Sequence, residues 1–428
     1  MSGSRILVVL SYAAMAAGPV AAQTPSARLP SLTIAQAVDE AVAHNLSLFA
    51  QRASLSIAEA AAITARLRPN PVFSFSADHL DLLGTHYDAS NNGGPPEIAW
   101  RVDMPIERGG KREARMVVAS IARSAAEAQV ADFVRVLRQD VTLACVDFLA
   151  AKATRALVAD NLRAFQDLAR VNAARAAAGS IAPFESTRSQ VAMLQFRSTM
   201  VRADLDLATA AARLRTLLGR APLDPIDITD DLALADGLAE ADVAPLEDLA
   251  LVSRPDLQAL QRTEARSAAD LRLQEAIGKI DYSVGAEYRR QQGVAGKGNS
   301  LGFFVSAPLP FSNRNQGEIA RAGAEHEQSA RQIAARRAEI ASEVRTAYHE
   351  YVTTKDLVSE MKRDLLTPAT SAREISTYTY RAGGSTLLEL LDAQRAFNDT
   401  MQSYVDAQAN LRRSASRLNA AVAVEVVP

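Results

Sequence analysis

One pair of carboxylates is spaced so that both side chains could attract the same cation. Glu389 and Asp392 lie three residues apart in a helical stretch that follows Gly383 and Gly384, so both side chains lie on one helix face. Carboxylates that converge in a narrow passage favour cations, and their mutual repulsion raises some of their pKa values. The same residues also fit a structural role, because acidic side chains are favoured near the positive end of a helix dipole.

The other reactive residue types form no catalytic or metal-binding pattern. The sequence has no Ser/His/Asp order and no His-Glu-x-x-His motif, and Gly109 to Arg112 lacks the spacing of a phosphate-binding loop. Cys145 is the only cysteine, and its apolar helix position favours a small core residue over a reactive thiol. One loop holds potential metal ligands without ligand-type spacing: Asp78, His79, Asp81, His86 and Asp88. We expect no catalytic residue, no metal site, no cofactor and no enzymatic activity.

The N-terminus has the features of a secretory signal peptide. Arg5 precedes an apolar run from Ile6 to Ala17, and Val20-Ala21-Ala22 fits a cleavage site, so we expect residues 1–22 to be removed. A membrane anchor is the alternative, but the run is short and is broken by Gly18-Pro19. No other stretch reaches the about 18–20 apolar residues of a transmembrane helix. The mature chain is therefore either soluble in the periplasm or inserted as a β-barrel. Its net charge of −2 gives no reason to expect a nucleic-acid partner.

The sequence is an internal duplication. Ala178 to Glu185 matches Ala382 to Glu389 at an offset of 204 residues, and Ala41 to Asn45 matches Ala250 to Arg254. A third set of pairs has an offset of 203 residues: Asp140, Ala144, Phe148 and Lys152 with Glu343, Ala347, Tyr351 and Lys355. We expect a first repeat over residues 23–220, a linker over 221–244, a second repeat over 245–423 and a tail over 424–428.

Each repeat has the same order of expected elements: a helix, two strands, a very long helix, a glycine turn and a returning helix. The first helices are expected over Leu32 to Arg68 and Pro245 to Gly278, and the long helices over Gly110 to Ala177 and Gly317 to Arg381. The returning helices are expected to end near Gly219 and Ala423. A helix of about 68 residues spans about 100 Å and must pack in a coiled coil. The sequence predicts a rod two helices thick whose tip is the glycine turn.

Four segments alternate apolar and polar residues with strand periodicity. They surround Phe73 to Asp78, Ile98 to Met104, Tyr282 to Arg289 and Leu301 to Ala307, and each is about as long as a tilted transmembrane strand. Polar segments from Asp81 to Pro96 and from Gln291 to Asn299 are the expected external loops. A pair of hairpins packed on a soluble domain fits the alternation equally. Four strands cannot close a barrel around water, whereas three copies give twelve.

The motifs beside these strands resemble those of the TolC family of outer-membrane efflux proteins, most closely its heavy-metal (cobalt–zinc–cadmium) resistance branch. The resemblance covers nearly all of the mature chain and rests on three motifs: Leu67 to Pro71, Pro105 to Arg112 and Leu309 to Ile319. Ala41 to Asn45 and Arg254 to Leu257 fit the family's repeat openings, although Leu46 stands where proline is usual.

The resemblance implies a mainly α fold with a small β part. A homotrimer would close a 12-stranded barrel in the outer membrane and extend a coiled-coil helical barrel through the periplasm. The chain would be the exit duct of a tripartite efflux system, with a periplasmic adaptor (membrane fusion) protein and an inner-membrane pump of the RND type as partners. Its cargo would be heavy-metal cations or small toxic compounds. The alternative is a periplasmic coiled-coil adaptor or scaffold, which should show one hairpin and a lipoyl-like β module.

The resemblance also assigns roles at the tips. Glu389 and Asp392 match the constriction carboxylates, Tyr380 matches the gate tyrosine, and Ser385 stands where the family has a gate arginine. In the first repeat Arg188 stands opposite Asp392. The tips expected to dock on the adaptor contain Gly179, Ser180, Ile181, Phe184, Gly383, Gly384, Leu387 and Leu388, whose apolar members could equally only staple the hairpins.

Overall fold

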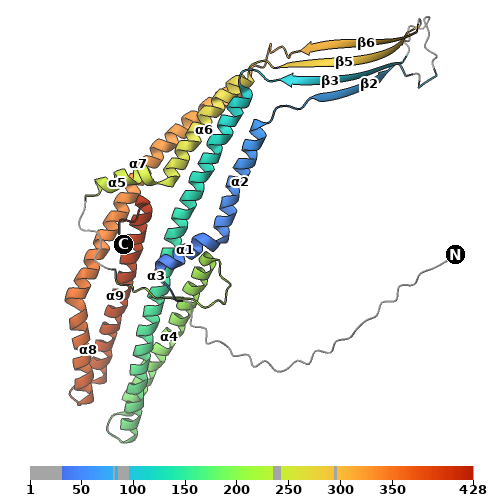
Figure 1. The fold of residues 1–428 in the computed structure, drawn as a ribbon. Helices are drawn as coiled ribbons and strands as arrows, with labels where there is room; N and C mark the ends of the chain where they lie inside the picture. The colour runs from blue at the N-terminus through green and yellow to red at the C-terminus, as the bar shows by residue number, and fades with distance from the viewer. Residues whose placement is uncertain (1–30, 81, 85–95, 235–241, 294–295, 428) are drawn as a thin grey trace, which may run out of the picture.

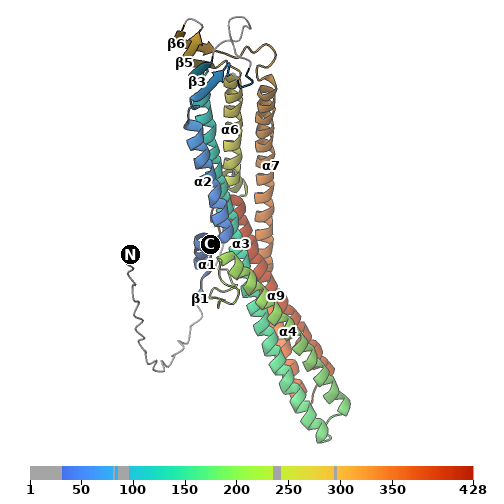
Figure 2. The ribbon, with the colours of Figure 1, turned by 90° about the vertical axis from the view of Figure 1, so that its right-hand side faces the viewer.

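The protein is a long rod with a β-sheet at one end and two helical hairpins at the other (Figures 1 and 2). The computed structural model describes residues 31–80, 82–84, 96–234, 242–293 and 296–427. The expected signal peptide, and Asp81, His86 and Asp88 of the first external loop, lie outside these residues.

The helices follow the duplicated order that the sequence predicts. The first repeat contains α1 (Ile34–His44), α2 (Leu46–Arg66), α3 (Lys111–Ala177) and α4 (Pro183–Leu218). The second contains α5 (Ala244–Ser253), α6 (Pro255–Ile277), α7 (Gln316–Glu360), a π-helical turn (Met361–Leu365), α8 (Leu366–Arg381) and α9 (Leu387–Val422). Thus the 67-residue α3 confirms the long helix of the first repeat.

Three of the predicted continuous helices are in fact interrupted. The first helix of each repeat breaks at one residue with extended backbone, Asn45 or Arg254. Asn45 caps α2 by accepting a hydrogen bond from the Leu48 amide, and Pro255 favours the break after Arg254 because a residue before proline avoids helical geometry. The second long helix is interrupted by the π-helical turn.

The four predicted strands form one antiparallel sheet in the order β2-β3-β5-β6. Their bounds are β2 Val72–Asp78, β3 Glu97–Ile106, β5 Tyr282–Gly293 and β6 Gly296–Ser306. One prediction was wrong: most of the Gln291-to-Asn299 loop is strand, and the pairing continues to Gln292 with Lys297 and Gly293 with Gly296. Backbone pairing does not need an apolar sequence, so the polar composition there concealed the strand ends.

A two-residue parallel pair was missed. β1 (Ser31–Leu32) pairs with β4 (Asp227–Ile228), which lies inside the segment expected to be only a linker. Ile228 is buried in the core beside α3, and the Ile34 amide donates to Asp230 over 2.6 Å. The segment therefore ties the start of the first repeat to the end of α4. Strands this short carry no readable periodicity.

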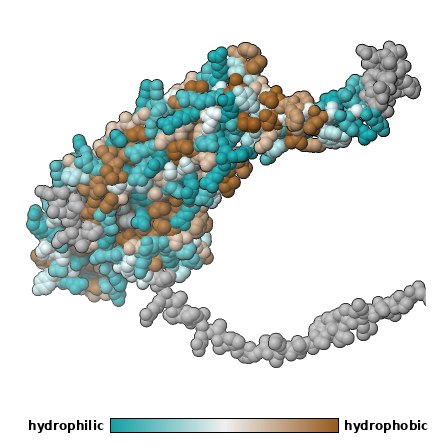
Figure 3. Space-filling view, turned by 45° about the horizontal axis from the view of Figure 1, so that its top comes forward, coloured by the Kyte–Doolittle hydropathy of each residue, from teal (hydrophilic) through white to brown (hydrophobic). Residues whose placement is uncertain are grey.

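The two faces of the large sheet differ in chemistry. One face exposes large apolar side chains: Phe73, Phe75, Trp100, Val102, Met104, Tyr288, Leu301, Phe303 and Val305. On the opposite face Arg101 pairs with Asp103, and Arg289 with Glu97 and Glu287. Figure 3 shows hydrophobic residues gathered over the part of the sheet nearest the helices. This is the division expected of lipid-facing and water-facing surfaces.

No helix in the described part of the chain combines the length and apolar character needed to cross a bilayer.

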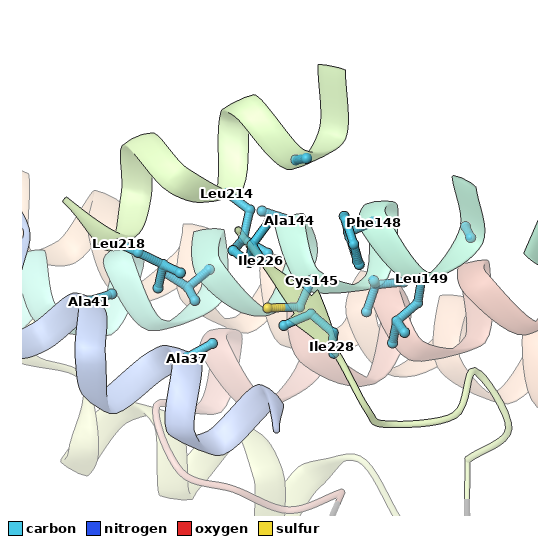
Figure 4. Packing of buried hydrophobic residues seen from close by; sticks show 14 of the residues in the cluster. Ala37, Ala41, Ala144, Cys145, Phe148, Leu149, Leu214, Leu218, Ile226 and Ile228 are labelled. Carbon is cyan, nitrogen blue, oxygen red and sulfur yellow. The ribbon is translucent and has the colours of Figure 1, made fainter. Parts of the chain in front are cut away.

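Three apolar clusters hold the helices together. In the first, α1, α3, α4 and β4 bury residues that include Cys145, Leu214 and Ile228 (Figure 4). Burial and the nearby Asp230 charge raise the pKa of the Cys145 thiol to about 12, so it is an inert core residue, as predicted. A second cluster, around Tyr351 and Leu418, is its counterpart in the second repeat. The third joins the two hairpins near their tips.

Candidate functional site at the hairpin tips

Both hairpins reverse direction at a glycine with left-handed backbone. Gly179 has φ +69° and Gly383 has φ +79°. Each turn closes the helix before it with two backbone hydrogen bonds, for example from the Ser180 amide to the Arg175 carbonyl over 2.8 Å and from the Gly384 amide to the Thr379 carbonyl over 2.8 Å. This is the usual glycine-terminated helix end. A Cβ at Gly179 would meet no described atom within 4 Å, so the backbone conformation, not lack of space, requires glycine there.

Glu389 has a structural role at the start of α9. Its amide donates to the Thr386 hydroxyl over 3.3 Å, and its carboxylate accepts from the Thr386 amide over 2.9 Å. This reciprocal pair is a capping box, which fixes where α9 begins. The helix-start interpretation of Glu389 therefore holds, and its exposed carboxylate keeps one oxygen available for another partner.

Asp392 is the less engaged carboxylate of the pair. Its side chain is 60% exposed, and its ion pair with Arg395, one turn on, has a long separation of 3.8 Å. Such an exposed pair contributes little free energy. In the first hairpin Glu185 lies in the first turn of α4, with Arg188 three residues later. The two tips thus differ in charge: the second exposes two carboxylates where the first has one carboxylate and one cation.

Tyr380 connects the two hairpins. Its hydroxyl donates to Asn172 Oδ1 over 2.9 Å, which joins the end of α8 to α3. Tyr380 is 6% exposed and Asn172 is fully buried. Burial raises the pKa of Tyr380, with the Asn172 hydrogen bond opposing it, so the phenol stays protonated and remains a donor at neutral pH.

Sequence reasoning identified Tyr380 and missed Asn172. The available signal was an asparagine at an inward position of a coiled-coil helix, a residue type that often specifies helix register. Two further polar contacts continue the seam between α9 and α3: Gln394 with Asn161 over 3.3 Å and Gln402 with Thr154 over 3.1 Å. Near the tip the seam between the hairpins is therefore held by these neutral hydrogen bonds and by one from the Arg175 guanidinium to the Arg381 carbonyl over 3.3 Å.

Ser385, which stands where the family resemblance implies a gate arginine, makes a contact within its own turn. Its hydroxyl lies 3.2 Å from the Thr379 hydroxyl. The end of α8 is connected to the first hairpin by Tyr380 and by the Arg175 guanidinium, which donates to the Arg381 carbonyl over 3.3 Å.

The expected docking residues divide into exposed and buried groups. Phe184 is 70% exposed, Leu388 is also exposed, and Ile181 is half-buried. Leu387 is only 3% exposed and packs in the third cluster with Tyr380 and its neighbours. Leu387 therefore staples the hairpin, and its side chain is inaccessible to a docking protein in this arrangement.

A family model and the sequences of related proteins all place the chain in the same family. The sequence model of the family described as "Outer membrane efflux protein" matches residues 37–220 and 246–424. The cobalt-zinc-cadmium resistance protein CzcC of Cupriavidus metallidurans is 24% identical over 399 residues, which cover 91% of this chain and 89% of that protein. Nodulation protein T of Rhizobium leguminosarum bv. trifolii is 22% identical, over 90% of this chain and 84% of that protein.

Solved structures share the fold. The CusC channel superposes with a TM-score of 0.75 at 18% identity, covering 92% of each chain. The open-state MtrE outer membrane channel of Neisseria gonorrhoeae gives a TM-score of 0.72 at 16% identity, covering 92% of this chain and 89% of that one. The described chain has two hairpins and four long strands, and it matches this family. The alternative of a periplasmic adaptor is therefore rejected. The chain belongs to the outer membrane efflux protein family and is the outer-membrane exit duct of a tripartite efflux system, extending into the periplasm.

Proposed function

We propose that three copies of the chain form one duct whose narrowest point is lined by Glu389 and Asp392. The observation that carries this proposal is the exposure of both carboxylates beside the Tyr380–Asn172 connection, at the tip of the α8–α9 hairpin and at the end of the rod opposite the sheet (Figure 1). Three copies would place six carboxylates around one axis. Rings of like charge in a confined passage favour cations over anions.

Assembly of several copies is supported by surfaces that one chain leaves uncovered. β2 and β6 are the sheet edges, each with a neighbour on one side only among the described strands. Along α4, large apolar side chains are exposed at coiled-coil spacing: Val191, Leu194, Val201 and Leu205. An unpaired sheet edge is unfavourable in lipid, and an exposed apolar helix seam is unfavourable in water. A closed ring of three copies covers both surfaces.

The constriction is tested by the reversal potential of single channels in a KCl gradient across a planar bilayer. Glu389→Gln with Asp392→Asn should reduce cation selectivity and weaken block by trivalent cations. Asp167→Asn, which removes an exposed carboxylate from α3, is the matched control and should leave both unchanged. Wild-type selectivity and block in the double variant would place the constriction elsewhere.

We further propose that the cargo consists of divalent heavy-metal cations. Support comes from CzcC, whose name assigns it to cobalt, zinc and cadmium resistance, and from the exposed carboxylates at the tip. A strain that lacks the gene should become sensitive to these metals, and the wild-type gene should restore growth. Sensitivity to small toxic organic compounds alone would assign the duct to that cargo class.

The duct catalyses no reaction in this proposal, and an RND-type pump supplies the energy. The adaptor would contact the exposed apolar side chains Ile181, Phe184 and Leu388. Phe184→Ala should lower metal resistance and adaptor cross-linking while the protein still reaches the outer membrane. Val252→Ala, at a comparably exposed position on α5, is the control for loss of apolar surface as such. Equal cross-linking in Phe184→Ala and wild type would remove the tip from the docking surface.

A further inference from the structure

Between Lys355 and Gly383 the second repeat contains one residue more than the first repeat has between Lys152 and Gly179. Lys152 pairs with Lys355 at an offset of 203 residues, whereas Gly179 pairs with Gly383 at an offset of 204. One residue is therefore inserted between Lys355 and Gly383. The π-helical turn Met361–Leu365 lies in this interval, and a π turn accommodates one residue more than an α turn. The first repeat has no such turn, because α3 is continuous from Lys111 to Ala177.

The burial pattern shows the same insertion independently. In the second helix the inward positions run Tyr351, Thr354, Val358 and Met361, then Leu366, Ala369 and Arg373. The steps are three or four residues long except from Met361 to Leu366, where the step is five. The buried positions of α3 across the corresponding stretch, Val158, Asn161, Phe165, Ala169 and Asn172, keep steps of three or four. The π turn thus keeps the inward face in register below the insertion.

Pro368 explains why the insertion is accommodated at this point. Proline has no amide hydrogen to donate to the carbonyl four residues earlier, and its ring crowds that carbonyl. The carbonyl belongs to Asp364, inside the π turn. The corresponding position of α3 is Ala164, which imposes no such defect. Insertion and proline therefore coincide, and both weaken the backbone hydrogen bonds of the same turn.

Few side chains hold this turn against its surroundings. Lys362, Arg363, Asp364 and Leu365 are all exposed, and Arg363 forms an ion pair with its own neighbour Asp364. Below the turn, the hairpin is attached to α3 through the third apolar cluster and through a few single hydrogen bonds: Tyr380 with Asn172, Gln394 with Asn161, and Arg175 with the Arg381 carbonyl. A weakened turn, with these contacts between the turn and the tip, forms the elements of a hinged arm.

We propose that Met361–Leu365 and Pro368 position the gate by acting as a hinge, about which the Gly383 hairpin swings while the Gly179 hairpin stays rigid. This inference rests on the proposed location of the constriction at the tip. Tyr380 and the third cluster then hold the arm in its closed position. The asymmetry between two otherwise duplicated hairpins has a function: the insertion gives mobility to the hairpin that carries Glu389 and Asp392.

The hinge is tested first by amide hydrogen exchange on the full-length protein in lipid nanodiscs. Amides of residues 362–367 should exchange at least about tenfold faster than those of residues 159–164, the corresponding stretch of α3. Equal protection in the two stretches would overturn the proposal without any variant.

A variant that removes the hinge tests its effect on gating. Deletion of Lys362 combined with Pro368→Ala restores the offset of 203 residues and permits a continuous α-helix. It should slow exchange at this stretch to the level of α3 and lower the open probability of single channels. A variant that loses the fast exchange but opens like the wild type would show that the turn is not the gate hinge.

The two proposals fail in different ways. Glu389→Gln with Asp392→Asn should leave exchange at residues 362–367 unchanged. If that variant keeps wild-type selectivity while the hinge variant opens less often, the constriction is misplaced and the hinge stands. If selectivity changes and exchange is uniform along both long helices, the constriction stands and the hinge is wrong.

Discussion

Asn45 and Arg254 occupy the same position in the two repeats and make the same contact with different chemistry. Each ends one helix and begins the next with nearly equal backbone angles, φ −64° and ψ 122° for Asn45 and φ −69° and ψ 120° for Arg254. Each side chain donates to the end of the returning helix: Asn45 to the Leu217 carbonyl over 2.8 Å, and Arg254 to the Ala421 carbonyl over 3.2 Å. The two acceptors are 204 residues apart, the offset of the duplication.

The contact in the second repeat has become a buried ion-pair network. Arg254 is 2% exposed and pairs with Asp256 and Glu343, and both carboxylates also bind Arg336. Arg254→Met would leave two carboxylates with one cation between them. Losing one partner of a buried pair costs about 3–5 kcal/mol, so we expect a large fall in melting temperature. Asn45→Ala, which removes only a neutral cap, should cost about 1–2 kcal/mol. Equal losses in thermal melts of the two variants would contradict this ranking.

The same network predicts a loss of stability in acid. Burial alone would raise the pKa of Asp256, but hydrogen bonds from Arg254 and Arg336 outweigh it and lower the pKa to about 2. A carboxylate with a lowered folded-state pKa stabilises the fold above its unfolded value, near 3.9, and loses that contribution as pH falls toward 2. The melting temperature of the wild type should therefore drop between pH 4 and pH 2. Asp256→Asn should melt lower at pH 6 and drop less over this range, and parallel curves would contradict the assignment.

Periodicity predicted the architecture because long elements repeat their signal many times. The 67-residue α3 and the strands around Trp100 and Val284 follow from spacing alone, whereas the pairing of these two strands does not. Features that depend on one residue were missed. The break at Arg254 is one of them: Pro255 favours it locally, but the ion pair that fixes the Arg254 side chain there joins it to Glu343, which is 89 residues away in sequence.

The candidate site shows the same limit. Glu389 was found because it lies just after a glycine turn, and Tyr380 through the family resemblance, whereas Asn172 became apparent only once α8 was packed against α3. The inserted residue was visible in the sequence as a change of offset, but its location at the π turn was not.

Two glycines with the same backbone conformation should respond differently to substitution. Gly219 has φ +71° and Gly179 has φ +69°, so alanine at either costs about 1–2 kcal/mol of conformational energy. A Cβ at Gly219 would also lie 2.4 Å from the backbone carbonyl oxygen of His44, whereas a Cβ at Gly179 meets no described atom within 4 Å. Gly219→Ala should therefore lower the melting temperature clearly more than Gly179→Ala. Equal melting temperatures would mean that α1 shifts freely away from the end of α4.

The hydroxyl of Tyr380 should set how firmly the tip is closed. Its hydrogen bond to Asn172 joins the end of α8 to the first hairpin, beside the bond from Arg175 to the Arg381 carbonyl, and Asn172 Nδ2 has no partner among the described residues. Tyr380→Phe removes the donor and keeps the apolar packing, which should weaken closure by about 1 kcal/mol and raise the ratio of open to closed channels about fivefold. Tyr378→Phe, an exposed hydroxyl two residues away on the same helix, is the matched control and should gate like the wild type. Single-channel recordings measure both. An unchanged open probability in Tyr380→Phe would show that apolar packing alone, through Leu387, Leu390 and Leu391, keeps the tip closed.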